Sequence, residues 1–190
     1  MNRGSIEDKV FKAEDITKNP LETGEYESCS FLGCNFANKD LSTFTFSECE
    51  FLDCDFSNAN LNETTFREGD FRNCKLLGVR FDKCNKFLLS FNFQDCNLGF
   101  ASFYNLKLKK IFFKNCKLEQ VDFTEADLQE GKFEKCDLSA AVFDNTNLER
   151  ADLRSAENFS IDPEKNRIKK AKFSSINLSG LLDKYHLEIQ

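Results

Sequence analysis

A bulky apolar residue recurs at every fifth position along most of this chain. The first run is Phe31, Phe36, Leu41, Phe46, Phe51, Phe56, Leu61, Phe66, Phe71, Leu76 and Phe81. Lys86 breaks it, and it resumes two residues later at Leu88, Phe93, Leu98, Phe103, Leu108, Phe113, Leu118, Phe123, Leu128, Phe133, Leu138, Phe143, Leu148 and Leu153. A period of five matches neither an α-helix nor a β-strand, so the chain must bend once per unit.

A second, longer period appears in the residues that lie two positions before these apolar sites. They are usually small, and all nine cysteines of the chain occupy this slot, Cys84 in the unit whose centre is Lys86. Cys34, Cys54 and Cys74 are 20 residues apart, as are Cys96, Cys116 and Cys136, and the gap of 22 between the two sets contains the inserted pair. Four units per turn predict a square solenoid in which equivalent residues stack on successive rungs.

The repeating unit resembles that of a known family. Units such as Ala126-Asp127-Leu128-Gln129-Glu130 have the form A(D/N)LXX, with Phe common at the centre, and this motif is similar to that of the pentapeptide-repeat family. The resemblance covers about residues 27–155, with a weaker continuation to about residue 178. It implies an all-β fold, a right-handed quadrilateral β-helix. The sequence predicts about six to seven rungs, roughly 4.8 Å apart, with an interior filled by Phe, Leu and Cys.

Three segments follow from the pattern. Residues 1–26 are expected to be an N-terminal cap or extension, and residues 27–178 the solenoid, with a register shift of two near 85–90. Residues 157–166 are expected to be irregular, because the central slots fall on Asn158 and Pro163 and proline cannot donate a ladder hydrogen bond. Residues 179–190 are expected to be a C-terminal cap or, as the resemblance suggests for some members, a homodimer contact.

Composition excludes several functions. A net charge of −6 and a pI near 5.0 argue against direct nucleic-acid binding. No stretch approaches the roughly 20 apolar residues of a membrane span, and the N-terminus lacks the apolar core of a signal peptide, so we expect a cytoplasmic protein. The single histidine, His186, and the lack of nucleotide-binding motifs predict no enzyme, no catalytic residue and no cofactor. No cysteine pair has zinc-site spacing, so we expect buried free thiols and no metal.

The 20-residue register also predicts which charged residues stack on neighbouring rungs. Lys107, Lys110, Lys114 and Lys117 are each expected over a carboxylate one rung along, at Asp127, Glu130, Glu134 and Asp137. Lys169 and Lys172 are expected over Glu149 and Asp152 in the same way. Exposed pairs of this kind contribute about 0–1 kcal/mol each. They align rungs and cancel the local field.

One acidic cluster has no such partner in this reasoning. Glu48 is expected to stack on Glu68, and Glu50 on Asp70, so that four carboxylates share one corner. Three interpretations stand: a solvated surface, a docking patch for a basic partner, and a site for a divalent cation such as Ca²⁺.

The predicted function is that of a non-enzymatic scaffold that binds a protein partner, without direct contact to nucleic acid or membrane. The alternative comes from the resemblance to quinolone-resistance members of the family, which implies an acidic DNA mimic that binds DNA gyrase, a type II topoisomerase. This chain departs from those members because its first interruption adds only two residues and much of its charge pairs between rungs. In either case the four corner carboxylates are the predicted partner-binding residues.

Overall fold

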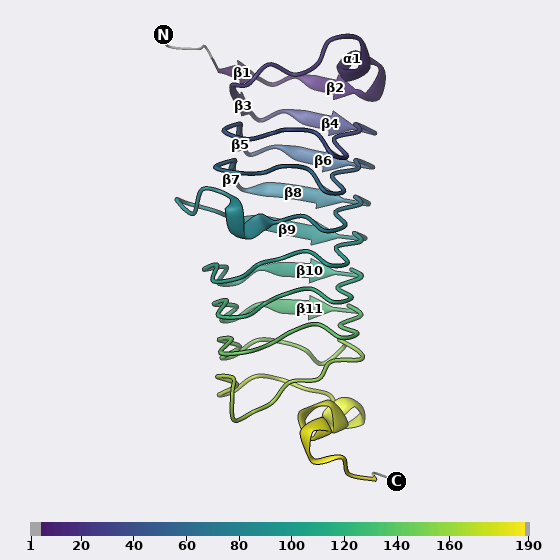
Figure 1. Cartoon of the computed structure of the whole chain (residues 1–190), viewed down its shortest axis with the longest axis vertical. Helices are drawn as coiled ribbons and strands as arrows, with labels where there is room; N and C mark the ends of the chain where they lie inside the picture. The colour runs from purple at the N-terminus through teal and green to yellow at the C-terminus, as the bar shows by residue number, and fades with distance from the viewer. Residues whose placement is uncertain (1–4, 189–190) are drawn as a thin grey trace.

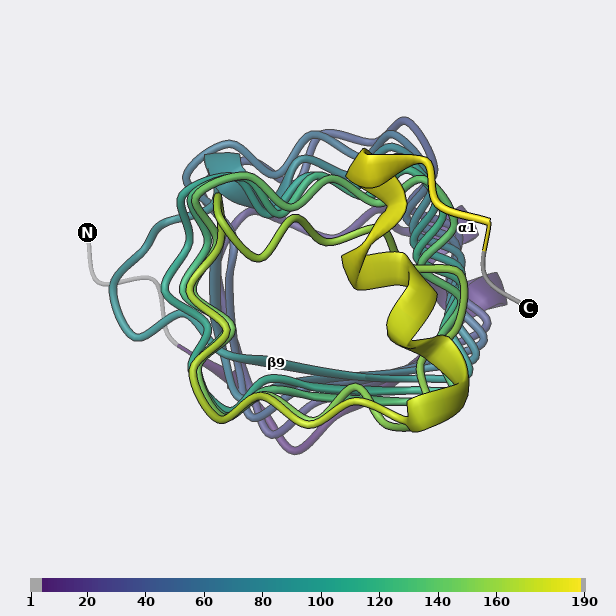
Figure 2. The ribbon, with the colours of Figure 1, turned by 90° about the horizontal axis from the view of Figure 1, so that it is seen from below.

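The computed structural model describes residues 5–188, and it is a right-handed, four-sided β-solenoid (Figures 1 and 2). The coils stack along one axis, with the N-terminus at one end and the C-terminus at the other. Seen along that axis, successive coils superpose as a square (Figure 2). The predicted fold class is therefore confirmed.

Two parallel sheets form adjacent sides of the square. One has four strands, β1 (Ile6–Glu7), β3 (Glu25–Glu27), β5 (Thr45–Ser47) and β7 (Thr65–Arg67). The other stacks seven, β2 (Val10–Lys12), β4 (Ser30–Leu32), β6 (Glu50–Leu52), β8 (Gly69–Arg72), β9 (Phe91–Gln94), β10 (Phe112–Lys114) and β11 (Lys132–Glu134). Phe51 pairs with Phe71 across 20 residues, and Phe71 with Phe93 across 22, as predicted. The other two sides are held by isolated parallel bridges, most of them with the same 20-residue offset.

The bend required once per unit is a left-handed residue two positions after most of the central apolar side chains. Asn38, Thr43, Glu48, Asp53 and Asn58 are consecutive examples, with φ between 53° and 65°. The polar residue before the centre supports the turn, because its side-chain oxygen accepts the N–H two residues on, as Asp55 does from Ser57 at 2.8 Å. This explains why the second position of the repeat is so often Asp or Asn.

The interior is packed with stacked rings. On the side that carries the seven-stranded sheet, the rings of Phe31, Phe51, Phe71, Phe93 and Phe113 stack at centroid distances of 4.7–5.3 Å. Rings on the other sides meet these edge-on, for example Phe46 on an adjacent side against Phe51 at 5.4 Å, and Phe103 on the opposite side against Phe113 at 5.8 Å. Offset stacks and edge-on contacts are the favourable aromatic geometries, so one repeated Phe slot yields a continuous core.

All nine cysteines are buried and free, as predicted. Most thiols donate to backbone carbonyls, as Cys54 does to Phe31 at 3.3 Å. Burial raises the pKa of Cys49 to about 12. Such thiols are small apolar core residues that are protonated at neutral pH.

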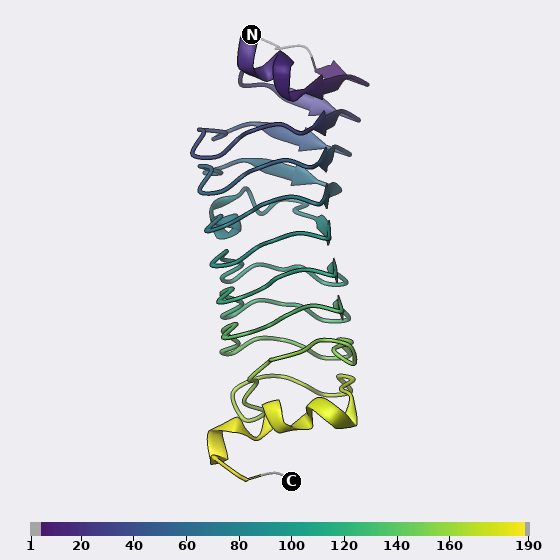
Figure 3. The ribbon, with the colours of Figure 1, turned by 90° about the vertical axis from the view of Figure 1, so that its right-hand side faces the viewer.

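The N-terminal segment contributes its own rung. β1 pairs with β3 and β2 with β4, so paired strands begin at Ile6, inside the region expected to be a cap or extension. After β2 the chain forms α1 (Ala13–Lys18), a short helix at the N-terminal end of the rod (Figure 3). Its Ile16 packs against the core cluster. The first four residues of the expected cap lie outside the described residues.

The C-terminal end carries two 3₁₀ helices, η2 (Ser175–Leu181) and η3 (Asp183–Tyr185), which lie over one side of the square (Figure 2). Gly180 is buried against Phe159, and its carbonyl accepts the N–H of Ile161 at 2.9 Å. Lys184 reaches back to Asp162 at 2.8 Å and to Glu164 at 2.6 Å. Residues 179–188 therefore contact the solenoid as a cap would; the last two residues lie outside the described residues.

Two register assignments were wrong in detail. Leu88 does not point inward: it is 64% exposed, and regular packing resumes with the buried Phe91 and Phe93. In the irregular segment the inward positions are taken by Phe159 and Ile161 rather than by Asn158 and Pro163. In both places the chain moves an apolar residue into the core instead of holding the five-residue count.

Candidate functional site

The predicted acidic corner lies between the two strand-bearing sides of the solenoid. Ser47 of β5 pairs with Arg67 of β7, and Glu48 and Glu68 follow these residues directly, both with φ of 53°. Glu50 of β6 pairs with Asp70 of β8. The structure thus brings the four carboxylate residues together as two stacked pairs on adjacent rungs.

One of the two pairs is partly neutralised. Arg72 donates to Asp70 at 2.5 Å and lies 3.9 Å from Glu50, so the sequence-based view of an unpartnered cluster was wrong for these two residues. The hydrogen bond to Asp70, with its charge, raises the pKa of Arg72. The missed signal was the alternation of strands, because residues 70 and 72 share a face.

A surface groove runs beside the other pair. It crosses the edges of β3, β5 and β7, and its carboxylates are Glu25, Glu27, Glu48 and Glu68, with Arg67 as the basic residue among them. Leu88, Leu89 and Ser90 line it at one end. The groove therefore combines a row of carboxylates with the base of the inserted loop, and sequence reasoning had not identified Glu25, Glu27 or the loop as parts of it.

The two-residue insertion forms a projecting loop on this side of the rod (Figure 1). The loop is anchored at both ends, since Asn85 donates its N–H to Thr64 at 2.9 Å, and the Ser90 hydroxyl accepts the N–H of Glu68 at 2.7 Å. Its tip presents Phe87 and Leu88, which are 66% and 64% exposed. Two large apolar side chains held in solvent by a fixed loop are typical of an interaction site.

The net charge of the chain is concentrated at the same end. Residues 1–72 contain 15 Asp and Glu against 7 Lys and Arg, whereas residues 73–190 contain 17 against 19. The negative field therefore belongs to the first coils, and the rest of the rod is nearly balanced.

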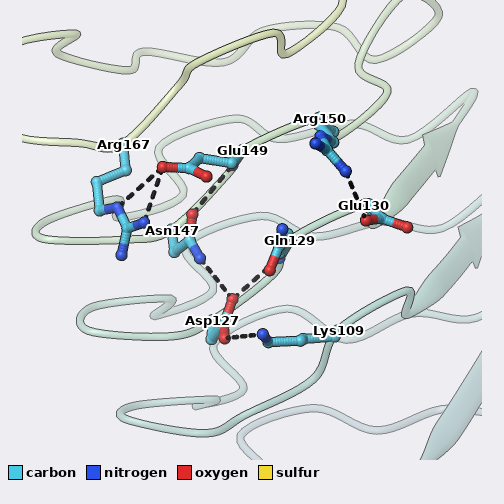
Figure 4. A network of polar contacts seen from close by, with 8 residues as sticks. All are labelled: Lys109, Asp127, Gln129, Glu130, Asn147, Glu149, Arg150 and Arg167. Carbon is cyan, nitrogen blue, oxygen red and sulfur yellow. Dashed lines mark hydrogen bonds and ion pairs between the residues drawn. The ribbon is translucent and has the colours of Figure 1, made fainter.

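The later coils show how that balance arises (Figure 4). Asp127 accepts from Asn147 at 2.7 Å and from the N–H of Gln129 at 3.2 Å, and lies 3.6 Å from Lys109. Glu130 pairs with Arg150 at 3.5 Å, and Glu149 with Arg167 at 2.8 Å. The predicted cancellation occurs, but through Lys109, Arg150 and Arg167 instead of Lys107, Lys110 and Lys169. The backbone register is as predicted, and the charged side chains form ion pairs with other residues near the expected ones.

Residues 5–188 lack two further classes of site. In that part of the chain no three His, Cys, Asp or Glu residues are grouped so that they could hold a metal ion. No helix there is long and apolar enough to cross a membrane.

The fold and the site together describe a β-solenoid with one interrupted side. The family described as Pentapeptide repeat region matches residues 24–103, 45–119, 87–158 and 106–182, so the chain belongs to the pentapeptide-repeat family. No curated protein sequence matches the chain.

Solved structures share the same architecture. Full-length QnrB1, a plasmid-mediated fluoroquinolone resistance protein, aligns with a TM-score of 0.56 and 21% identity over 97% of this chain and 100% of that one. A trypsin-treated variant of QnrB1 aligns with a TM-score of 0.58 and 18% identity over 98% of both chains. HetL, a pentapeptide-repeat protein involved in heterocyst differentiation regulation in the cyanobacterium Nostoc, aligns at 0.32 and 17%, over 88% and 84%. At 18–21% identity, the likeness to the two QnrB1 structures shows the fold alone.

Proposed function

We propose that this protein is a non-enzymatic, cytoplasmic scaffold that binds a protein partner at the interrupted side. The observation that carries the proposal is the exposed pair Phe87 and Leu88 at the tip of an anchored loop, next to the carboxylate-lined groove. The complementary surface on a partner has an apolar pocket for the loop tip and basic side chains for the groove. The exposed apolar tip favours a docking patch over a merely solvated corner.

Affinity capture from lysate with four variants of the purified protein tests this function. Phe87→Ser with Leu88→Ser removes the apolar tip, and Glu27→Gln, Glu48→Gln with Glu68→Gln removes three groove charges. Ile176→Ser, at an 87% exposed residue far from the loop, controls for surface hydrophobicity. Glu119→Gln, Glu134→Gln with Glu157→Gln controls for total charge.

The expected result is a partner that the wild type and both controls retain and that both site variants lose. We expect the groove variant to bind more weakly mainly because it associates with the partner more slowly. In the wild type this association rate should depend strongly on ionic strength. Equal capture by all the variants would disprove the site.

A second candidate is binding to DNA gyrase at its DNA site. It is motivated by the fold shared with QnrB1 and by the acidic first coils. The balanced charge of residues 73–190 limits DNA-like character to one end of the rod. A supercoiling assay with and without a fluoroquinolone decides it: inhibition or drug rescue that the groove variant abolishes supports it, and no effect well above micromolar concentration excludes it.

A further inference from the structure

Six buried thiols form a continuous column along one corner of the core. Cys34, Cys54, Cys74, Cys96, Cys116 and Cys136 occupy the same slot on six consecutive rungs, and each is at most 2% exposed. The residue after each one forms a parallel bridge to its equivalent on the next rung, as Lys75 does with Asn97. Scaffold function does not require this uninterrupted run, since Ala59, Ala101, Ala126 and Ala141 fill equivalent slots elsewhere.

The spacing of the rungs sets the spacing of the sulfurs. Neighbouring strands lie about 4.8 Å apart, and the stacked Phe rings on the adjoining side repeat at 4.7–5.3 Å. Equivalent thiols on consecutive rungs therefore repeat at about the same interval. A zinc–thiolate bond is about 2.3 Å, and bonds of that order to a linear, two-coordinate ion place two sulfurs about 4.6 Å apart. One rung of the solenoid matches that separation.

We propose that this cysteine column binds Cu(I), each ion being held in linear coordination between the thiolates of two consecutive rungs. Metals that require three or four protein ligands find no such group among residues 5–188. Soft thiolates suit Cu(I), zinc and Fe–S clusters, and because the column offers its thiolates in pairs, the two-coordinate ion, Cu(I), is the one that fits. A groove on the outer surface of this corner is lined in part by Cys74, Cys96 and Cys116, so the column lies directly beneath the surface.

Binding exchanges protons for the ion. Two thiols lose their protons to solvent for each Cu(I), which leaves a unit with one net negative charge. The two thiols give up S–H donation to backbone carbonyls, such as that from Cys54 to Phe31 at 3.3 Å, and the backbone compensates in part, as the N–H of Cys74 donates to the Cys96 sulfur at 3.4 Å. Contact with the neighbouring Cys136 thiol, together with burial, raises the pKa of Cys116 to about 12. The apparent affinity should therefore rise about 100-fold per pH unit near neutrality.

Two variants with equal numbers of cysteines test the geometry. Replacing Cys49, Cys54, Cys96 and Cys136 with Ala leaves five cysteines, none directly above another. Replacing Cys29, Cys34, Cys49 and Cys84 with Ala also leaves five, and these form an unbroken run from Cys54 to Cys136. Alanine already occupies this slot at Ala126 and Ala141, and far-UV circular dichroism checks that both variants keep the β-solenoid signal.

Anaerobic titration with Cu(I) against a colorimetric chelator measures the affinity. The wild type and the unbroken variant are expected to bind at least one ion, with X-ray absorption showing two sulfur neighbours. The interrupted variant is expected to bind about 100-fold more weakly, because it lacks the second ligand held at the right distance. Equal affinity of the two variants would refute the proposal, as would the absence of binding to the wild type.

The thermal midpoint separates binding in the folded column from capture of unfolded chains. Cu(I) bound in the column stabilises the folded state, so the midpoint should rise with metal concentration in the wild type and the unbroken variant. A midpoint that falls on adding Cu(I) would show that the ion prefers the unfolded thiols, which also overturns the proposal.

Discussion

Replacing Phe113 with Ala tests whether the stacked rings stabilise the rod. Phe113 is fully buried and stacks on Phe93 and Phe133, both at 5.3 Å, with edge-on contacts to Phe103 at 5.8 Å and Phe123 at 6.0 Å. Phe→Ala in a core costs about 3–5 kcal/mol. Phe143 is the matched control, because it is also buried but has one ring partner, Phe123 at 5.2 Å. At roughly 0.5–1.5 kcal/mol per aromatic pair, Phe113→Ala should cost about 1.5–4.5 kcal/mol more than Phe143→Ala.

Equilibrium urea unfolding followed by far-UV circular dichroism measures both costs. Should Phe113→Ala not fold, Phe113→Leu retains apolar volume while losing four ring pairs, and about 2 kcal/mol or more is expected. Costs for Phe113 and Phe143 that agree within about 0.5 kcal/mol would show that the rings act only as apolar volume.

Three further predictions concern the backbone, the cap and the thiols. Ala140→Gly relaxes a left-handed residue with φ of 54°, so it should stabilise the folded state by up to about 1 kcal/mol. Ala141→Gly removes a buried methyl group and should destabilise the folded state by a similar amount. Urea unfolding measures both changes. Gly180→Ala would place a Cβ 2.1 Å from the carbonyl oxygen of Phe159, so limited proteolysis should release the C-terminal helices sooner. Burial raises the pKa of Cys49 from 9.0 to about 12. The folded state therefore keeps a proton that the unfolded chain releases, and this contribution to stability falls as pH rises from about 9 to 12, by about 1.4 kcal/mol per unit. The decline should be shallower in Cys49→Ala.

The core was predictable because its signal is periodic. A Phe or Leu every fifth residue determines the inward positions, and the 20-residue offset of the cysteines determines which of them stack. The inward positions and the stacking both follow from the pairing of backbone strands, as in the Phe71–Phe93 pair across the insertion. A bend in every unit was also implied, because a five-residue unit must turn once, whereas the left-handed residue that makes the bend was not predicted.

The interruptions were less predictable, since a period says nothing where it fails. Counting alone placed Leu88 in the core, and it could not distinguish two extra residues within a strand from a loop that projects from the rod. The sequence also does not determine which charged side chains pair, because exposed ion pairs contribute little energy and several partners lie within reach. Arg72 near Asp70, and Lys109 near Asp127, illustrate that freedom.

The core accommodates the two-residue insertion because small and large side chains pack together around it. Gly69 pairs with Phe91, and a Cβ on Gly69 would lie 3.3 Å from the Phe71 ring, so the small residue leaves room for that ring beside the insertion. Phe91 thereby closes the core directly after the loop, and the ring stack continues from Phe71 to Phe93 at 5.2 Å. A loop rooted in an unbroken core is pre-organised, so its apolar tip loses little conformational entropy on binding. For this reason the proposed partner is to be sought at the interruption and not at one of the regular sides.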